Sequence, residues 1–593
     1  MKAAKMKERP RKPETATASG GIVTTYTVLL LLPLLSAAVA HPPSGVDQAS
    51  LADREPDQSY NAQEEAFMHT PPGFDKPGKP AVAKEPGTAT LRVTIVDAAT
   101  GKPTFCRVNV VGPDGNYYQP ADHPLGPWSR HKFDFRETYS PSRYYGWFFY
   151  TNGDFQVTVP AGSSRIEVWK GYEYRPLKRT VQLAADSSRV ELRLTRTVSM
   201  HALGYYSGDT HIHLNRRNEE DDQRSLDLMA AEDLQYGFLL CTNDTGSYSG
   251  RMDRQMWPQQ RGFGAASVRK RGRYGIVSGQ EYRANTYGHI CLLMHDRLVL
   301  EGLTVDPNNW PVFGLVGRDT RRLGGYAFHA HGGYSQEIYA DYVQRVTDGV
   351  ELLQMAHYRG IGLKGWYRIL NVGFRFPALA GSDFPYGRAL GDCRNYVYAA
   401  NRPDFAGWTR SAAEGRSFFT TGPFLLLEVD GRRPGETIEL AGNKAHRLAV
   451  RGRVRSEITP VTRLDLIVNG QTVKRSSVPD GSRQGRWHEL RHELTVDGSC
   501  WIAARAHSIS PTGRPDAEAH TNPVYVDVDG NKPYNADDLN WLLARLDERI
   551  ALLTQRSFPE KTEALTFFQE SRRGLLVIRK RQGQAKADAT HSR

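Results

Sequence analysis

Apolar and polar residues alternate with a period of two in the stretch that follows residue 88. Leu91–Val96 and Arg107–Val111 have this pattern, and so do Asp154–Pro160 and Arg165–Lys170. Side chains two residues apart lie on the same face of a strand, so each stretch can bury one face and expose the other. Short alternating segments separated by turns are typical of a β-sandwich. We therefore predict a sandwich over residues 89–198.

The middle of the chain has a different pattern, in which short apolar runs alternate with helix-like stretches. The expected strands are Tyr236–Cys241, Gly275–Val277, His289–Met294, Gly325–His329, Gly349–Gln354 and Phe376–Ala380. Leu226–Leu234 and Glu337–Val346 have helical spacing between them. Strands that alternate with helices are typical of βα units. The pattern predicts a β/α barrel over residues 199–424, with its chemistry at the C-terminal ends of the strands.

Strand-like alternation returns after residue 424. Three stretches predict a second sandwich over residues 425–530: Arg447–Val454, Arg463–Val468 and Cys500–His507. Residues 531–593 are predicted to form a helical hairpin with a basic tail, and Asn535 can cap the first helix. The predicted fold class is therefore multidomain, with an α/β barrel between two β-sandwich modules and a C-terminal helical hairpin.

Residues 1–40 have the three parts of an export signal. Six basic residues precede the apolar run Val28–Leu35, and Ala38 and Ala40 form an A-x-A cleavage pattern. Cleavage would leave no stable membrane span and would deliver the chain to the periplasm or the cell exterior. The alternative is an uncleaved anchor, because Ile22–Ala40 is about long enough to cross a bilayer.

Composition narrows the range of partners. The 593-residue chain has a formal charge of +12, but residues 571–593 alone carry seven basic residues and one acidic residue. The large middle is nearly balanced, so we expect no nucleic-acid partner. The five cysteines are scattered without C-x-x-C spacing, which predicts buried free thiols. Residues 41–88 are rich in Pro, Ala, Asp and Glu and are predicted to be a disordered linker.

The first sign of chemistry is the hexapeptide GDTHIH at residues 208–213. In a strand, Asp209, His211 and His213 would lie on one face. Two imidazoles so placed can bind one metal ion from a single rigid element. We interpret Asp209 as a carboxylate that orients an imidazole.

Other expected strand ends carry similar side chains. Glu281 lies in a G-x-E sequence, His289 in G-H, His331 in A-H-x-G and Asp383 in G-S-D, while Asp244 ends a T-N-D sequence. Each residue alone is more often a turn former or a core residue. Their coincidence at strand ends points to a metal centre.

Taken in order, these motifs resemble the PHP (polymerase and histidinol phosphatase) superfamily of metallohydrolases. The segments SGDTHIHLN, SGQEYRANTYGHICLLM, GGYAFHAHGG and GSDFPYG are most similar to its carbaryl-hydrolase-like (CehA/McbA) branch. The resemblance covers about residues 200–424 and implies a distorted seven-stranded β/α barrel. Residues 89–198 resemble the carboxypeptidase regulatory-like β-sandwich.

The resemblance also implies a centre of two divalent ions, which would be Zn, Mn or Fe. The first ion would be bound by His211, His213, Glu281 and Asp383. The second would be bound by Glu281, His289 and His331, with Glu281 bridging. Three histidines of the family's third site are missing here, so Asp244 and Glu219 would offer at best a weaker, oxygen-rich site for a harder ion.

Two such ions would activate a water molecule and polarise a C=O or P=O bond. A nearby acid, either His329 or Asp244, would protonate the leaving group; His329 could instead be an extra ligand or orient one. These features predict an exported hydrolase that acts on a phosphoester or a carboxylic or carbamic ester in a small-molecule or polymer-derived substrate. A second interpretation stays open, namely an extracytoplasmic binding protein whose barrel has lost activity.

Overall fold

The computed structural model describes residue 83 and eleven segments of the chain. These are residues 87–121, 148–184, 187–243, 250–251, 257–306, 308–334, 337–354, 357–385, 389–442, 444–509 and 515–591. Every described residue belongs to one compact unit of the chain. The predicted export signal, nearly all of the predicted linker and Asp244 lie outside the described residues.

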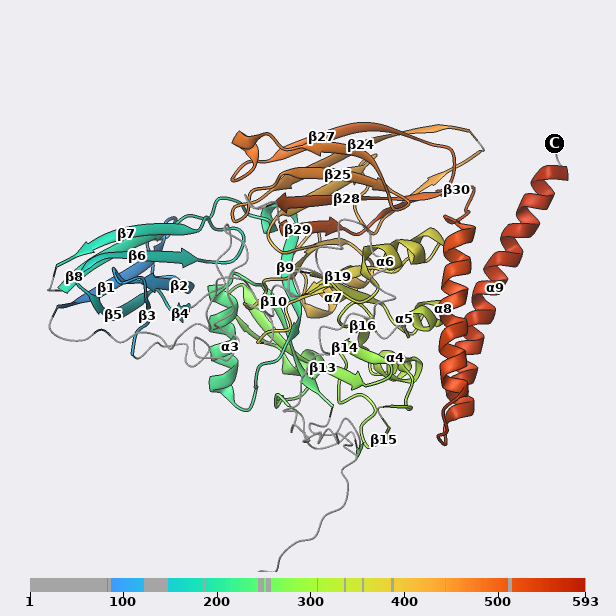
Figure 1. Cartoon of the computed structure of the whole chain (residues 1–593), viewed down its shortest axis with the longest axis horizontal. Coiled ribbons are helices and arrows are strands. Elements are labelled where there is room, and N and C mark those ends of the chain that lie inside the picture. The colour runs from blue at the N-terminus through green and yellow to red at the C-terminus, as the bar shows by residue number, and fades with distance from the viewer. Residues whose placement is uncertain are drawn as a thin grey trace, which may run out of the picture. The chain divides into compact units, whose positions relative to one another are not determined.

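The N-terminal module consists of two small sheets that face each other across a shared core. Its strands are β1 (Thr88–Asp97), β2 (Cys106–Val111), β3 (Tyr117–Tyr118), β4 (Phe149–Thr151), β5 (Asp154–Pro160), β6 (Gly162–Trp169), β7 (Leu177–Leu183) and β8 (Ser187–Leu194). One sheet has the order β5-β1-β8, and the other has the order β3-β2-β6-β7 with β4 paired to β2. Figure 1 shows β6 and β7 as neighbouring long strands of this module. Alternate residues such as Leu91, Val93 and Ile95 fill the core, as the period of two requires.

The middle of the chain forms a curled mixed sheet. Its main strands are β9 (Tyr205–Ile212), β10 (Tyr236–Thr242), β13 (Tyr274–Ala284), β14 (Gly288–Leu293), β16 (Tyr326–His329), β17 (Gly349–Gln354), β19 (Ala378–Gly381), β20 (Arg394–Tyr398) and β21 (Ser417–Thr420). Short strands accompany them: β11 (Gly250–Arg251), β12 (Arg269–Arg271), β15 (Thr304–Val305) and β18 (His357–Tyr358). The helices of this region are α3 (Glu219–Ala231), α4 (Phe313–Arg322), α5 (Ile338–Gln344), α6 (Gly362–Asn371) and α7 (Phe405–Ala413).

The predicted fold class, with its seven-stranded β/α barrel, is wrong. β14 is antiparallel to both β13 and β16, and β20 is antiparallel to both β9 and β21. The sheet then continues from β21 through β29 into the C-terminal strands instead of closing as a separate barrel of βα units. A short turn over residues 285–287 joins β13 to β14 where a βα unit would need a helix, and Gly288, which follows the turn, has φ of 94°.

The prediction failed because an apolar run does not indicate whether a strand is parallel or antiparallel to its neighbours. β9, β10 and β14 are buried along their whole length, as parallel barrel strands would be. Burial on both faces removes the alternation that marks an antiparallel strand with one wet face. The individual strand positions are close to those expected; β17, for example, has the expected bounds.

The C-terminal strands cover a second apolar core. They are β22 (Phe424–Val429), β23 (Thr437–Leu440), β24 (His446–Arg455), β25 (Arg463–Val468), β26 (Gln471–Ser477), β27 (His488–Val496), β28 (Cys500–Ile509), β29 (Pro515–Thr521) and β30 (Val524–Val528). β22, β24 and β27 form a three-stranded sheet, and the remaining six strands belong to the large sheet. Buried residues of both sheets, such as Leu427, Val450 and Leu466, meet between them.

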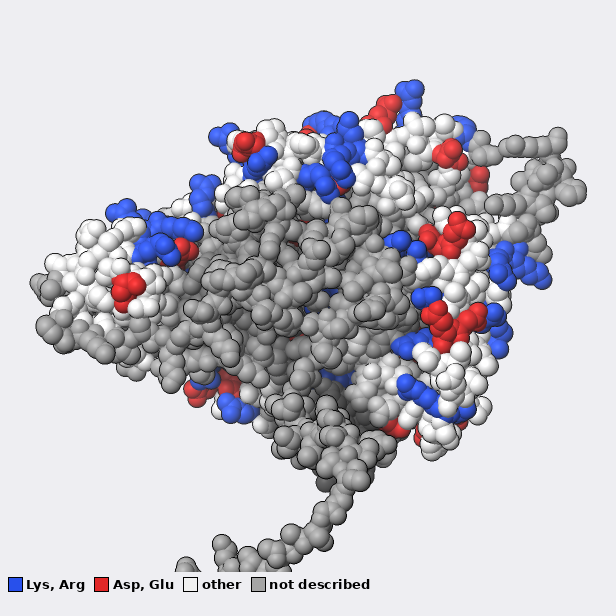
Figure 2. Space-filling view, viewed as in Figure 1, with Lys and Arg blue, Asp and Glu red and all other residues white. Residues whose placement is uncertain are grey.

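Two helices end the described chain, α8 (Ala536–Thr554) and α9 (Lys561–His591). Asn535 caps α8, since its side chain accepts the backbone N–H of Asp538 at 3.0 Å. Charges on these helices are of both signs: Arg572 pairs with Asp547, and Arg545 with Glu548. Figure 2 shows basic and acidic side chains interleaved along this part of the surface.

All five cysteines are buried and free. In the part of the chain that the structure describes, no helix combines the length and the apolar character that crossing a bilayer would require.

Candidate metal centre

Side chains from five parts of the large sheet converge on one buried point. His211 lies in β9, Glu281 in β13 and His289 in β14, while the other three follow the strand ends of β9, β16 and β19. All six predicted ligands are 0–5% exposed: His211, His213, Glu281, His289, His331 and Asp383. Each of the two predicted ligand sets is therefore brought together by the fold.

The first set has the spacing of a tetrahedral site. His211 Nε2 and His213 Nε2 lie 3.1 Å apart, and both approach Asp383 Oδ1, at 3.5 and 3.4 Å. Glu281 adds one oxygen 3.6 Å from His211 Nε2 and another 3.2 Å from His213 Nε2. Ligand atoms about 2.0–2.1 Å from a tetrahedral ion lie roughly 3.3 Å from one another. His211, His213 and Glu281 therefore have ligand spacing for one divalent ion, and Asp383 lies beside the two histidines.

The second set shares Glu281 with the first. His289 Nδ1 lies 2.8 Å from Glu281 Oε1 and 3.0 Å from His331 Nε2, and His331 Nε2 lies 3.2 Å from Glu281 Oε1. Three protein ligands leave a coordination position open, which is the arrangement of catalytic rather than structural sites. The buried His, Asp and Glu clusters could therefore hold a metal ion.

Two of the predicted ligands have a strained backbone conformation. His331 has φ of 53° and Asp383 has φ of 56°, a region that residues with a Cβ rarely adopt. Each such residue costs on the order of 1–3 kcal/mol, so the surrounding structure has to hold it in place. For His331 the next residue supplies this support, because the Gly332 N–H donates to the carbonyl of Glu351 at 2.8 Å.

Asp209 supports the Asp383 loop instead of orienting an imidazole. Its carboxylate accepts the backbone N–H groups of His211, Ser382 and Gly391, at 3.1, 3.0 and 3.1 Å. Burial raises the pKa of Asp209 to about 7, although these hydrogen bonds act in the opposite direction. The prediction that Asp209 orients an imidazole is therefore wrong. Its carboxylate connects β9 to the loop that carries Asp383.

Other acceptors orient the imidazoles. His211 Nδ1 donates to Glu351 Oε2 at 2.8 Å, His213 Nδ1 to the carbonyl of Leu240 at 3.0 Å, and His331 Nδ1 to Gln354 Oε1 at 2.5 Å. A carbonyl or carboxylate only accepts, so in each ring Nδ1 carries the hydrogen and Nε2 faces the centre as a ligand atom. Sequence reasoning missed Glu351 and Gln354.

Cys291 also lies within reach of His211. Its Sγ is 3.3 Å from His211 Nδ1 and 3.6 Å from Glu351 Oε2, so these three side chains form another group with ligand spacing. An ion there, together with one at His211 Nε2, would need His211 to lose both ring protons. Burial, and next the charge of Glu351, raise the pKa of the Cys291 thiol well above its usual range. A hydrogen bond from His211 to Glu351 explains this group more simply.

Arg283 contacts the predicted bridging carboxylate. Its Nε and Nη2 donate to Glu281 Oε2 at 2.8 and 2.6 Å. Burial alone would raise the pKa of Glu281, but the charges of Arg283 and then His211 hold it well below the usual range. Burial also lowers the pKa of His289 to about 3. Glu281 is therefore an anion and His289 a neutral imidazole, which are the forms that bind metals.

The remaining predicted residues lie elsewhere. His329 Nε2 lies 2.9 Å from Asp341 Oδ2 on α5 and its ring packs on Phe313, so it faces away from His331. The positive φ of His331 explains this, because it ends the alternation that would have placed both rings on one face. Glu219 is exposed and pairs with Arg261. The structure therefore does not bring His329 or Glu219 to the centre.

Aromatic rings border the ligands. The Trp257 ring stacks on His213 with 6.3 Å between centroids, and Tyr334 contacts His289 and His331 at 5.8 and 6.0 Å. Trp257 is 41% exposed, whereas the ligands beside it are buried.

Comparisons with known proteins provide no family assignment. No family model matches the chain, and no curated protein matches it. Among solved structures, PsfC from Pseudomonas syringae is 15% identical with a TM-score of 0.24, over 34% of this chain and 86% of PsfC. The CARDB domain of the PF1109 protein from Pyrococcus furiosus, solved with di-metal ions, is 18% identical with a TM-score of 0.12, over 18% of this chain and 89% of that domain.

A third structure, of the fibronectin(III)-like modules of Clostridium thermocellum CbhA, is 12% identical with a TM-score of 0.13. It covers 25% of this chain and 70% of that structure. At these scores none of the three similarities bears on function.

Proposed function

We propose that this chain is an exported metal-dependent hydrolase with a two-ion centre, which cleaves a phosphoester or a carboxylic or carbamic ester. One observation carries the proposal: Glu281 belongs to two buried groups with ligand spacing, one with His211 and His213 and the other with His289 and His331. The motif series that resembles the PHP superfamily supports it. The fold does not, because the β/α barrel implied by that resemblance is absent from the described residues.

The residues of the centre have separate tasks in this proposal. Divalent ions held here would supply Lewis acidity and a water of lowered pKa. His211, His213 and Asp383 hold one side of the centre, and His289 and His331 the other. Arg283 is a buried cation next to Glu281, and it can attract the negative charge that develops on the substrate.

A second candidate function is an extracytoplasmic binding protein that retains the centre without turnover. Two observations favour it: His329, a predicted proton donor, faces α5, and Arg283 already neutralises part of the charge of Glu281. A bound ion would share that carboxylate with a guanidinium.

A matched pair of histidines in one motif tests the proposal. His329 and His331 are both 1% exposed and two residues apart, but only His331 faces the centre. We expect His331→Gln to lose bound metal and hydrolysis of p-nitrophenyl phosphates or esters, while His329→Gln keeps its metal. The measurement is elemental analysis of the folded mature chain, followed by an activity screen with Zn, Mn or Fe supplied.

Each outcome of this experiment decides between the candidates. A wild-type chain that binds no metal contradicts both. Metal that depends on His331, without turnover of any substrate in the screen, supports the binding protein. Metal and turnover that are both lost in His331→Gln support the hydrolase.

A further inference from the structure

A cavity lies at the opposite edge of the strands that carry the centre. It has a volume of about 490 Å³, and its walls include residues that come just before β17 and β19. The metal ligands lie beyond the other ends of these strands, since Asp383 follows β19 and His331 contacts Gln354 at the end of β17. The cavity is therefore separate from the centre, and its volume is within the range of small-molecule sites.

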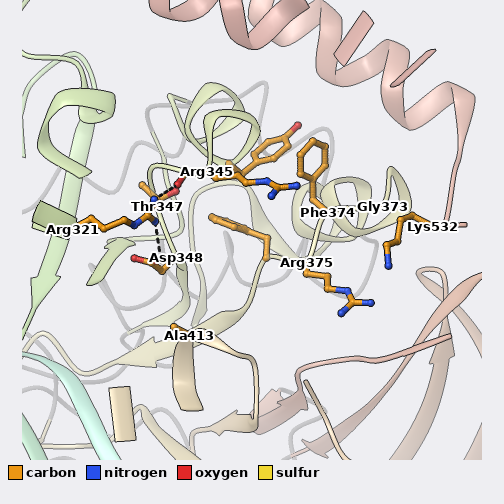
Figure 3. Close-up of a pocket in the computed structure, with 11 residues that line it drawn as sticks. Arg321, Arg345, Thr347, Asp348, Gly373, Phe374, Arg375, Ala413 and Lys532 are labelled. Carbon is orange, nitrogen blue, oxygen red and sulfur yellow. Dashed lines mark hydrogen bonds and ion pairs between the residues drawn. The ribbon is translucent and has the colours of Figure 1, made fainter. Parts of the chain in front are cut away.

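Cations outnumber acids around this cavity. Its lining includes Arg321, Arg345, Arg375 and Lys532, but Asp348 is its one carboxylate. Figure 3 shows Arg345 reaching toward Phe374, with Arg375 and Lys532 further along the cleft.

The carboxylates of Asp348 and Asp527 are the acidic groups next to these cations, and both already have partners. Asp348 accepts Arg321 at 3.1 Å and the Ala327 N–H at 2.8 Å. Asp527 is buried and does not line the cavity; its carboxylate contacts Arg375 at 2.8 Å and also Lys532. Four cations therefore face two carboxylates, which leaves an excess charge of about +2 on the cleft.

Arg345 is the cation without an acidic partner in the described part of the chain. It is exposed, and its backbone adopts φ of 54° at the end of α5. Its own carbonyl accepts Arg321 Nη1 at 2.6 Å, which fixes the backbone while the guanidinium stays available.

The C-terminal ends of nearby helices disfavour binding of an anion in this cavity, but their effect should be smaller than that of the arginines. α4, α5, α6 and α7 all end near the cavity, and their terminal carbonyls carry partial negative charge. The effect of a helix terminus falls off within its last turn, whereas an arginine donates charge-assisted hydrogen bonds directly to a bound anion. Direct contacts from the arginines should therefore dominate.

We propose that this cavity binds a small organic phosphate. Arginine guanidinium groups match the oxygens of a phosphate in a two-pronged geometry. The cavity is larger than a phosphate alone, and the partly buried Phe374 ring offers an apolar wall to an organic group. The inference is independent of the proposed hydrolase, because it uses none of its residues.

The probe is phenylphosphonate, a phosphate-ester analogue that cannot be hydrolysed at its P–C bond, titrated by calorimetry at low salt. We expect saturable binding to the full-length chain that persists in His211→Ala, whose predicted metal centre is disrupted. Arg345→Asn, which tolerates the positive φ, should weaken binding ~10-fold, the effect of losing one charge-assisted hydrogen bond. Lys532→Gln is a second variant, should Arg345→Asn fail to fold.

The matched control is Arg322→Gln. It removes one positive charge from the same end of α4, but Arg322 pairs with Asp319 and does not line the cavity. Binding that is unchanged in Arg345→Asn and Lys532→Gln overturns the proposal, and so does binding that disappears in His211→Ala. The absence of any binding at millimolar phenylphosphonate means that the cations only balance the helix ends, and this also overturns it.

Discussion

Glu351 is the residue that the structure adds to the predicted centre. It is fully buried in β17, where it accepts His211 Nδ1 at 2.8 Å and the Thr210 hydroxyl at 2.5 Å. A carboxylate that accepts from the far nitrogen of a ligand imidazole fixes the ring and increases its basicity. Glu351 therefore positions His211 without being a ligand itself.

Glu351→Gln should weaken metal binding at the centre. The amide can still accept from His211, but it carries no charge, and loss of such a partner typically lowers metal affinity ~10–100-fold. Competition with a chromophoric chelator measures this directly. Glu337→Gln is the matched control, because Glu337 is equally buried but contacts Phe313 and α5. Equal affinities in the two variants would contradict a positioning role.

The sequence supplied the ligands but not their supports. His211, Glu281 and Asp383 lie in recognisable motifs at strand ends, and the fold brings them together. Glu351 lies in the run GVELLQ, which looks like an ordinary core strand. Its one signal was a charge inside an apolar strand, since a buried carboxylate needs partners. The need for a partner does not reveal which residue the Glu351 carboxylate contacts.

At the scale of the element, α5 begins beside a buried pair of acids. Glu337 Oε1 accepts the Phe313 N–H at 2.8 Å, and Asp341 contacts His329. Burial, and next the charge of Asp341, raise the pKa of Glu337 well above its ordinary value of 4.5. A carboxyl whose pKa rises on folding binds its proton more tightly in the folded state. Its contribution to stability is therefore full below pH 4.5 and decreases as the pH rises.

Glu337→Gln should remove this pH dependence. The side-chain oxygen can still accept the Phe313 N–H, but the amide does not titrate. The free energy of unfolding of the variant, relative to wild type, should increase by up to ~1.4 kcal/mol per pH unit above the ordinary carboxyl pKa. Urea denaturation at a series of pH values measures the difference. Glu493→Gln, an exposed residue of β27, provides the control, and a difference that does not change with pH would refute the expectation.

Elements were easier to predict than their arrangement. The alternation of Asp154–Pro160 and the length of Gly349–Gln354 reproduce β5 and β17. The directions of β14 and β20 depend on short turns and on partners far away in sequence, which a local pattern does not encode. The barrel was therefore mistaken even though the six expected strands overlap β10, β13, β14, β16, β17 and β19.

At the scale of the whole molecule, the large sheet couples the centre to distant parts of the chain. β21 pairs with β29, so the sheet that carries His211 and Glu281 is continuous with the C-terminal strands. Close packing locks this connection: a Cβ on Gly208 of β9 would lie 2.3 Å from the Trp408 ring, whose Nε1 donates to the carbonyl of Tyr206.

Metal removal should therefore destabilise the middle of the chain and not only its ligand loops. A ligand that binds only the folded state, present at 100 times its Kd, adds about 2.7 kcal/mol to the free energy of unfolding. We therefore expect a chelator to lower the Tm by a few degrees and added Zn or Mn to restore it. Differential scanning calorimetry measures the shift. In His211→Ala the Tm shift should be smaller, because three of the four groups with ligand spacing include His211 and only the group of Glu281, His289 and His331 does not. A shift of equal size in that variant would mean that the stabilising ion does not depend on His211. A wild-type Tm that does not respond to chelator or metal would mean that the converging side chains bind no ion.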